Sequence, residues 1–78
     1  MKYFTAFSTF PDIETARRVS RLLVEKRLVA CVNLMPQTES IYHWKGEVCE
    51  GKEVLAMMKT KESSLPELKS ELVDLHPY

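Results

Sequence analysis

The sequence predicts an α+β fold in which a strand, a helix, two long strands and a second helix follow one another. Three observations support this: strand-like composition over residues 3–10, the apolar period of amphipathic helices over residues 13–27 and 64–75, and two strand-like arms that flank Lys45-Gly46. This order supplies five of the six elements of the ferredoxin-like β-α-β-β-α-β fold, with the final strand missing. We expect a single domain over residues 1–78.

The first strand is expected at residues 3–10, where aromatic and β-branched side chains are dense. Apolar residues fall on both of its faces, which predicts a central place in the sheet. Asp12 follows the strand and has a side chain that helices prefer at the N-cap. From residue 13 to about residue 27, apolar side chains share one arc and the Glu and Arg side chains lie opposite. We therefore expect an amphipathic helix that covers one sheet face, with its arginines in solvent.

The two arms around Lys45-Gly46 are unusually long. Each approaches about 14 residues, whereas most strands have about 3–10. At about 3.3 Å per residue such an arm spans about 46 Å, although a compact chain of this length is only about 30 Å across. We therefore expect either that the arm breaks or that its far end lies on another chain.

Pairing centred on this turn places Cys49 opposite Tyr42 and Cys31 opposite Thr60. The two sulfurs then lie about 36 Å apart along the ribbon. A disulfide needs α-carbons within about 7 Å, so we expect no internal disulfide. We interpret both cysteines as buried, inert thiols.

The second helix is expected to begin at Ser64, which together with Glu67 has the form of a capping box. Its apolar face consists of leucines at helical spacing: Leu65, Leu68, Leu72 and Leu75. The helix should end at or before His76, because Pro77 moves the preceding residue out of the α region.

Composition excludes several classes of function. Eleven basic and eleven acidic side chains leave no net charge, and because polyanion-binding proteins normally have a basic excess, we expect no nucleic-acid partner. No apolar run approaches the ~20 residues of a membrane helix, so we expect no membrane partner and a cytoplasmic location. The two glycines form no phosphate-binding loop, and no Ser/His/Asp or Cys/His pattern stands out, so we expect no enzyme.

Several motifs resemble the CutA family of divalent-cation tolerance proteins, in the right order and over nearly the whole chain. They are Ser8-Thr9-Phe10-Pro11-Asp12, the run VEKRLVACVNLMP from Val24 to Pro36, Ser40-Ile41-Tyr42-His43-Trp44-Lys45-Gly46-Glu47, and Leu75-His76-Pro77-Tyr78. The resemblance implies a homotrimer of ferredoxin-like subunits with a role in tolerance of copper and other divalent cations. In the family the chain continues through a further strand, so we expect this domain to be C-terminally incomplete or its open edge to be covered by another chain.

The resemblance also implies copper ligands: a cysteine late in the first strand and two adjacent histidines before Pro-Tyr. Those positions here hold Ser8, Leu75 and His76, so His76 alone remains as a candidate ligand for copper or another divalent cation. One imidazole is a weak site, because copper prefers thiolate, thioether or several imidazoles. A role for His76 at the helix end, without any metal, stays open.

Other candidate ligands are weaker. His43 lies in the hairpin tip, and neither histidine has a His or Cys neighbour at the short spacing of zinc ligands. Thiolates of Cys31 and Cys49 could meet across a trimer interface. The thioethers of Met35, Met57 and Met58 could hold copper(I), but methionine more often fills a core.

Tyr42 and Trp44 are two residues apart, on one face of the arm and next to Lys45. Because aromatic side chains are enriched in interface cores, we expect these three residues at an oligomer interface or in a cleft that binds a small molecule between subunits. Three functions are compatible with this reading. We favour a metal-responsive trimer of the CutA type; the alternatives are a PII-like effector-binding or signalling module and a structural scaffold for a protein partner.

Overall fold

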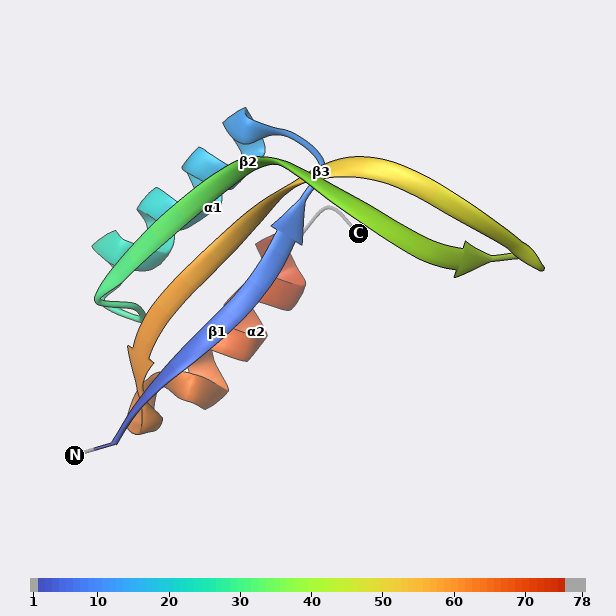
Figure 1. The fold of residues 1–78 in the computed structure, drawn as a ribbon. Helices are drawn as coiled ribbons and strands as arrows, with labels where there is room; N and C mark the ends of the chain where they lie inside the picture. The colour runs from blue at the N-terminus through green and yellow to red at the C-terminus, as the bar shows by residue number, and fades with distance from the viewer. Residues whose placement is uncertain (1, 76–78) are drawn as a thin grey trace.

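The computed structural model describes residues 2–75 of the chain (Figure 1). Its elements follow the predicted order: β1 (Tyr3–Phe10), α1 (Ile13–Glu25), β2 (Cys31–Trp44), β3 (Glu47–Lys61), a 3-10 turn (Glu62–Ser64) and α2 (Leu65–Leu75). The predicted α+β class and the order of strands and helices are therefore confirmed.

One antiparallel sheet holds the three strands in the order β1-β3-β2. Both helices pack on the same face of it (Figure 1), and the side chains between sheet and helices form the core. The largest fully buried side chains are Phe10, Leu23, Met58, Leu68, Val19 and Thr60. No described helix covers the opposite face, and we refer to it as the open face.

β1 lies at an edge of this sheet, so the predicted central place is wrong for the described residues. Tyr3 and Phe7 point to the open face and are 68% and 62% exposed, whereas Phe10 is buried against the helices. Apolar side chains on both faces of a strand indicate what could cover those faces. They do not report whether the strand has a neighbour on each edge.

Asp12 caps α1 as predicted. Its carboxylate accepts hydrogen bonds from the backbone N–H of Thr15 at 2.7 Å and from the Thr15 hydroxyl at 3.0 Å. The helix ends at Glu25, two residues before the predicted end, because Arg27 takes a φ of 60°. A residue in this left-handed conformation cannot continue a right-handed helix.

Lys45 and Gly46 form the predicted hairpin turn. Their φ values of 49° and 80° are both positive, as a two-residue turn of type I′ requires. β2 has 14 residues and β3 has 15, so the arms are as long as expected. Between Met35 and Thr38 the register shifts at a bulge, which bends the ribbon without ending it.

Cys49 lies opposite Tyr42 as predicted, but Cys31 lies opposite Lys59 rather than Thr60. The bulge inserts an extra residue in β2 and so moves every pair beyond it by one position. Both cysteines are free thiols. Their predicted burial is wrong, since Cys31 is exposed and Cys49 half-buried: neither lies on the sheet face that the helices cover.

The part of the hairpin beyond the bulge, residues 38–53, is here called the distal hairpin. It projects past both helices (Figure 1), and the molecule measures 42 × 23 × 20 Å with a radius of gyration of 13.4 Å. A compact chain of this length would have a radius of gyration of about 11.5 Å. The long arms neither stop nor fold back, and the placement of their far end on another chain stays a prediction.

α2 begins after Ser64 as expected, although a 3-10 turn that the sequence did not indicate precedes it. Leu68 is buried, and Leu72 and Leu75 pack against the core. An ion pair of 2.9 Å between Lys26 Nζ and Glu71 Oε2 joins the end of α1 to α2. Both side chains are partly exposed, so this pair contributes at most about 1 kcal/mol.

Candidate functional site

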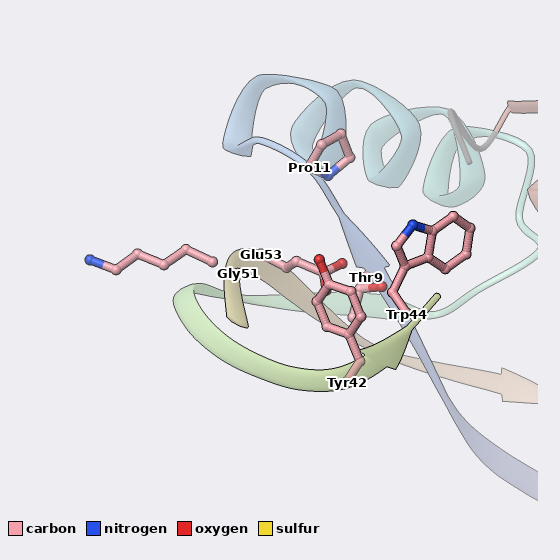
Figure 2. Close-up of a pocket in the computed structure, with 7 residues that line it drawn as sticks. Thr9, Pro11, Tyr42, Trp44, Gly51 and Glu53 are labelled. Carbon is pink, nitrogen blue, oxygen red and sulfur yellow. The ribbon is translucent and has the colours of Figure 1, made fainter. Parts of the chain in front are cut away.

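The distal hairpin forms one wall of a cleft of about 580 Å³, and the end of β1 with the turn after it forms the other (Figure 2). The cleft is lined by Thr9, Pro11, Tyr42, Trp44, Gly51, Lys52 and Glu53. Its volume falls in the range of about 300–1,000 Å³ that small-molecule sites occupy. Apolar walls with a few polar groups are also typical of such sites.

Tyr42 contributes the central side chain of the cleft. Its ring lies beside Gly51, where an added Cβ would be 3.8 Å from both Cε1 and Oη of the tyrosine. The side chain is still 47% exposed, and in Figure 2 its hydroxyl end points toward the part of the cleft that holds Thr9 and Glu53. The ring can therefore present one face to a ligand while its hydroxyl stays near polar groups.

Trp44 lies on the same side of β2 as Tyr42 (Figure 2) and is 61% exposed. The ammonium of Lys45 stands 5.9 Å from the centre of its ring. A cation–π contact at an exposed site contributes about 0.5–1 kcal/mol, enough to bias the indole toward one orientation. The structure thus brings Tyr42 and Trp44 together in the cleft. Lys45 does not line the cleft, but its ammonium contacts the ring of Trp44.

Five cleft residues were not identified from the sequence: Thr9, Pro11, Gly51, Lys52 and Glu53. The pairing of β1 with β3, in which Phe10 faces Val54, brings the end of β1 to the base of the distal hairpin. A motif search has no access to this register, because the two segments are far apart in the sequence. The one local signal in the sequence is the charged pair at 52 and 53, which directly precedes the apolar run from Val54 to Met58.

A metal site does not emerge from the described residues. Among residues 2–75, no three or more His, Cys, Asp and Glu side chains gather closely enough to hold an ion. His43 is exposed opposite Val48, and alternation along β2 places it on the other face from Tyr42 and Trp44. His76 lies outside the described residues. Within residues 2–75 of one chain, these donors therefore do not form a metal site.

Asp12, which follows the cleft residue Pro11 in the sequence, is a titratable group with a lowered pKa. Hydrogen bonds from the backbone N–H and the hydroxyl of Thr15 hold the pKa of Asp12 below its usual value of 3.8. Asp12 thus stays ionised at neutral pH as a helix cap, next to Pro11.

Within residues 2–75, no helix combines the length and apolar character needed to cross a bilayer.

A three-stranded antiparallel sheet with two helices on one face, a projecting hairpin and a cleft at its base define a class of ferredoxin-like α+β proteins. Solved structures belong to the same class. The divalent cation tolerance protein CutA1 from Thermus thermophilus superposes with a TM-score of 0.93 at 44% identity, over 99% of this chain and 75% of that one. The PII-like protein CutA from Nostoc sp. PCC 7120 gives a TM-score of 0.86 at 49% identity, over 95% of this chain and 69% of that one.

Sequence comparison narrows the class to a family. The family model for the CutA1 divalent ion tolerance protein matches residues 4–78, and human protein CutA is 51% identical over 73 residues. The chain therefore belongs to the CutA1 divalent ion tolerance family, and the resemblance seen in its motifs is confirmed. The alignment covers 94% of this chain but 41% of the human protein. The function of the whole human protein can therefore be extended to this chain only as a proposal.

Proposed function

We propose that this chain acts in tolerance of divalent cations as one subunit of a homotrimer. The observation that carries the proposal is the exposure of the distal hairpin, where Ile41 is 69%, Val48 72% and Trp44 61% exposed. Single apolar residues on a surface are ordinary, but these lie on both faces of one projecting ribbon. Another copy of the chain would cover such a ribbon, and the number three is what the resemblance to the CutA family implies.

The open face supports the same proposal. Phe7 and Met35 are 62% and 37% exposed there, and Leu55 and Met57 lie between them in register. An antiparallel sheet can leave one face in water when that face is polar, but the middle of this one is apolar. The chain carries no net charge, so long-range repulsion does not oppose association of identical copies.

Light scattering on protein eluting from a size-exclusion column tests the assembly. We expect a mass near three times the 9.1 kDa of one chain at micromolar concentration. A monomeric mass under these conditions would contradict the proposal.

For the cation, we propose His76 as one ligand of copper or another divalent ion, with the other donors supplied by further copies. The family resemblance supports this choice, and the lack of a donor cluster within residues 2–75 is the reason to look between copies. Calorimetric titration of copper(II) tests it on wild type, His76→Ala and the matched control His43→Ala. Loss of binding in His76→Ala alone is expected; equal affinity of all three proteins removes His76 from the site.

A second candidate function is effector binding of the PII-like kind, and the cleft at Tyr42 and Trp44 favours it. A planar metabolite could stack on the two rings while Lys52 or Glu53 fixes its polar end. Thermal-shift screens with nucleotides and carboxylates test this, with Tyr42→Ala as the variant that should lose the shift. A pull-down partner that depends on Trp44, with no ligand-induced shift, would instead favour a structural scaffold.

We further propose a cytoplasmic location and no nucleic-acid or membrane partner, on the basis of composition alone. One structural neighbour, from Archaeoglobus fulgidus, is described as a periplasmic divalent cation tolerance protein. Fractionation of cells with marker enzymes for each compartment is therefore the decisive measurement.

A further inference from the structure

A second cavity lies at the other end of the sheet from the cleft. It has a volume of about 390 Å³ and is lined by Tyr3, Val24, Arg27, Leu28, Val29, Ala30 and Lys61. Two of these side chains are cationic and none is acidic. The remainder are apolar except for the hydroxyl of Tyr3, so this cavity combines positive charge with an apolar wall.

Arg27 occupies a position that normally holds glycine. The backbone N–H of Leu28 donates to Leu23 O at 3.0 Å and that of Arg27 donates to Val24 O at 2.9 Å. These bonds are the Schellman motif that ends many helices, and its left-handed residue, here at φ 60°, is usually glycine. A side chain in this conformation is disfavoured by about 1–2 kcal/mol. Such strain beside a cavity is a reason to ask what the side chain does there.

The two cationic side chains of the cavity have no acidic partner among residues 2–75. Neither Arg27 nor Lys61 forms an ion pair with a described residue, whereas the neighbouring Lys26 is paired with Glu71. An adjoining groove of about 320 Å³ shares Val24 with the cavity, and it too has cationic but no acidic side chains in its lining: Arg17 and Arg21. The positive potential is therefore not cancelled from that side.

One feature opposes an anion here, because α1 points its C-terminus toward the cavity. A helix C-terminus carries the equivalent of about half a negative charge, which is smaller than the two full positive charges of Arg27 and Lys61. The carbonyls involved are also partly satisfied. Those of Leu22, Leu23 and Val24 accept hydrogen bonds from the backbone N–H groups that follow the helix.

We propose that this cavity binds a small organic anion, with a carboxylate or phosphate group held by Arg27 and Lys61 and an apolar body against the wall. The planar guanidinium can bond two oxygens of such a group at once, and the ammonium adds a point charge. Val24, Leu28 and the ring of Tyr3 offer the apolar contact. The proposal does not depend on the cleft, on His76 or on the number of subunits.

Calorimetric titration of the 78-residue protein with three probes that share a phenyl ring tests the proposal: phenylpropionate, phenyl phosphate and the neutral phenylpropanol. We expect the two anions to bind and the alcohol not to bind. Arg27→Gly and Lys61→Gln should each weaken binding by about tenfold or more, as expected for the loss of a charge-assisted hydrogen bond. Arg27→Gly is a safe variant for folding, because glycine suits the backbone at this position.

Arg18→Gln is the matched control. It removes one positive charge from an exposed position on α1 that lines neither the cavity nor the groove. Affinity equal to wild type in Arg18→Gln supports the site, and an equal loss in all three variants reduces the effect to overall charge and overturns it. Binding of phenylpropanol as tight as that of the anions, binding of inorganic phosphate as tight as that of phenyl phosphate, or no binding of any probe would each overturn it as well. The tighter of the two anions identifies the acid group.

Discussion

The buried hydroxyl of Thr60 provides a sharp test of what holds the end of the sheet to the helix layer. Thr60 is 1% exposed, and its Oγ1 donates a hydrogen bond of 2.6 Å to the backbone carbonyl of Leu28, which is itself buried. The bond joins the end of β3 to the segment that leads from α1 into β2. Replacing the hydroxyl by a methyl group in Thr60→Val keeps the shape of the side chain and removes the donor.

The size of the effect follows from what the substitution leaves behind. The new methyl gains a little from burial, but the carbonyl of Leu28 loses its partner in a place that water does not reach. An unsatisfied buried polar group costs about 1–3 kcal/mol. We expect the free energy of unfolding to fall by about 1–2 kcal/mol, which for a domain of this size lowers Tm by about 5–15 °C.

Thermal and urea unfolding followed by circular dichroism measure this change at one fixed protein concentration, because association also shifts Tm. Thr60→Ser is the matched control, since it keeps the hydroxyl and loses only a methyl group. Thr60→Val should be the less stable of the two. If valine were as stable as serine or more so, the hydrogen bond to Leu28 would contribute nothing beyond packing, and the reasoning would be refuted.

Three further predictions concern the two ends of α1 and the distal hairpin. Arg27→Gly should raise the free energy of unfolding by about 1 kcal/mol in chemical denaturation, because glycine relieves the strain of the left-handed backbone conformation. A clear loss of stability would show that packing of the arginine side chain outweighs this strain. Asp12→Ala should lower Tm at neutral pH. The pKa of Asp12 in the folded state is depressed below 3.8, so the stabilisation from its carboxylate is complete above the pKa of the unfolded state and is lost as the pH falls through the pKa of the folded state. The Tm difference from wild type should therefore shrink in acid, and a difference that stays constant with pH would contradict an ionised cap. Trp44→Ala should shift the assembled mass toward the monomer at low micromolar concentration. The control Val73→Ala, at an exposed position of α2, should leave the mass unchanged. Equal masses for both variants would show that the distal hairpin is not part of the interface.

Features with a local cause could be predicted from the sequence. The turn at Lys45-Gly46 follows from the need for positive φ at two successive residues, and the start of α1 follows from Asp12 as a cap. The end of α1 was misplaced because no glycine marks it: Arg27 takes the left-handed conformation that a glycine would normally announce.

Features that depend on strand register, or on which sheet face the helices cover, could not be predicted. The bulge after Met35 changes the partner of Cys31 by one position. Pro36 lies in this bulge, and a proline within a strand is typical of an edge or a bulge, but it does not specify by how many residues the register shifts. The cleft needs Thr9 beside Tyr42, which only the pairing of β1 with β3 provides. The exposure of Cys31 was missed for a related reason, since its burial was inferred from residue type without knowledge of which sheet face the helices cover.

The distal hairpin connects stability to assembly. A two-stranded ribbon without a covering layer is at best marginally stable in water, and residues 38–53 project beyond the helices that stabilise the rest of the sheet. Their cross-strand pairs include Ile41 with Glu50 and His43 with Val48, which offer little mutual apolar burial. We therefore propose that apolar contact from another copy of the chain stabilises the ribbon by covering the exposed side chains on its two faces. If that copy also lies against the cleft at Tyr42 and Trp44, ligand binding in the cleft and association of the subunits would each change the affinity of the other.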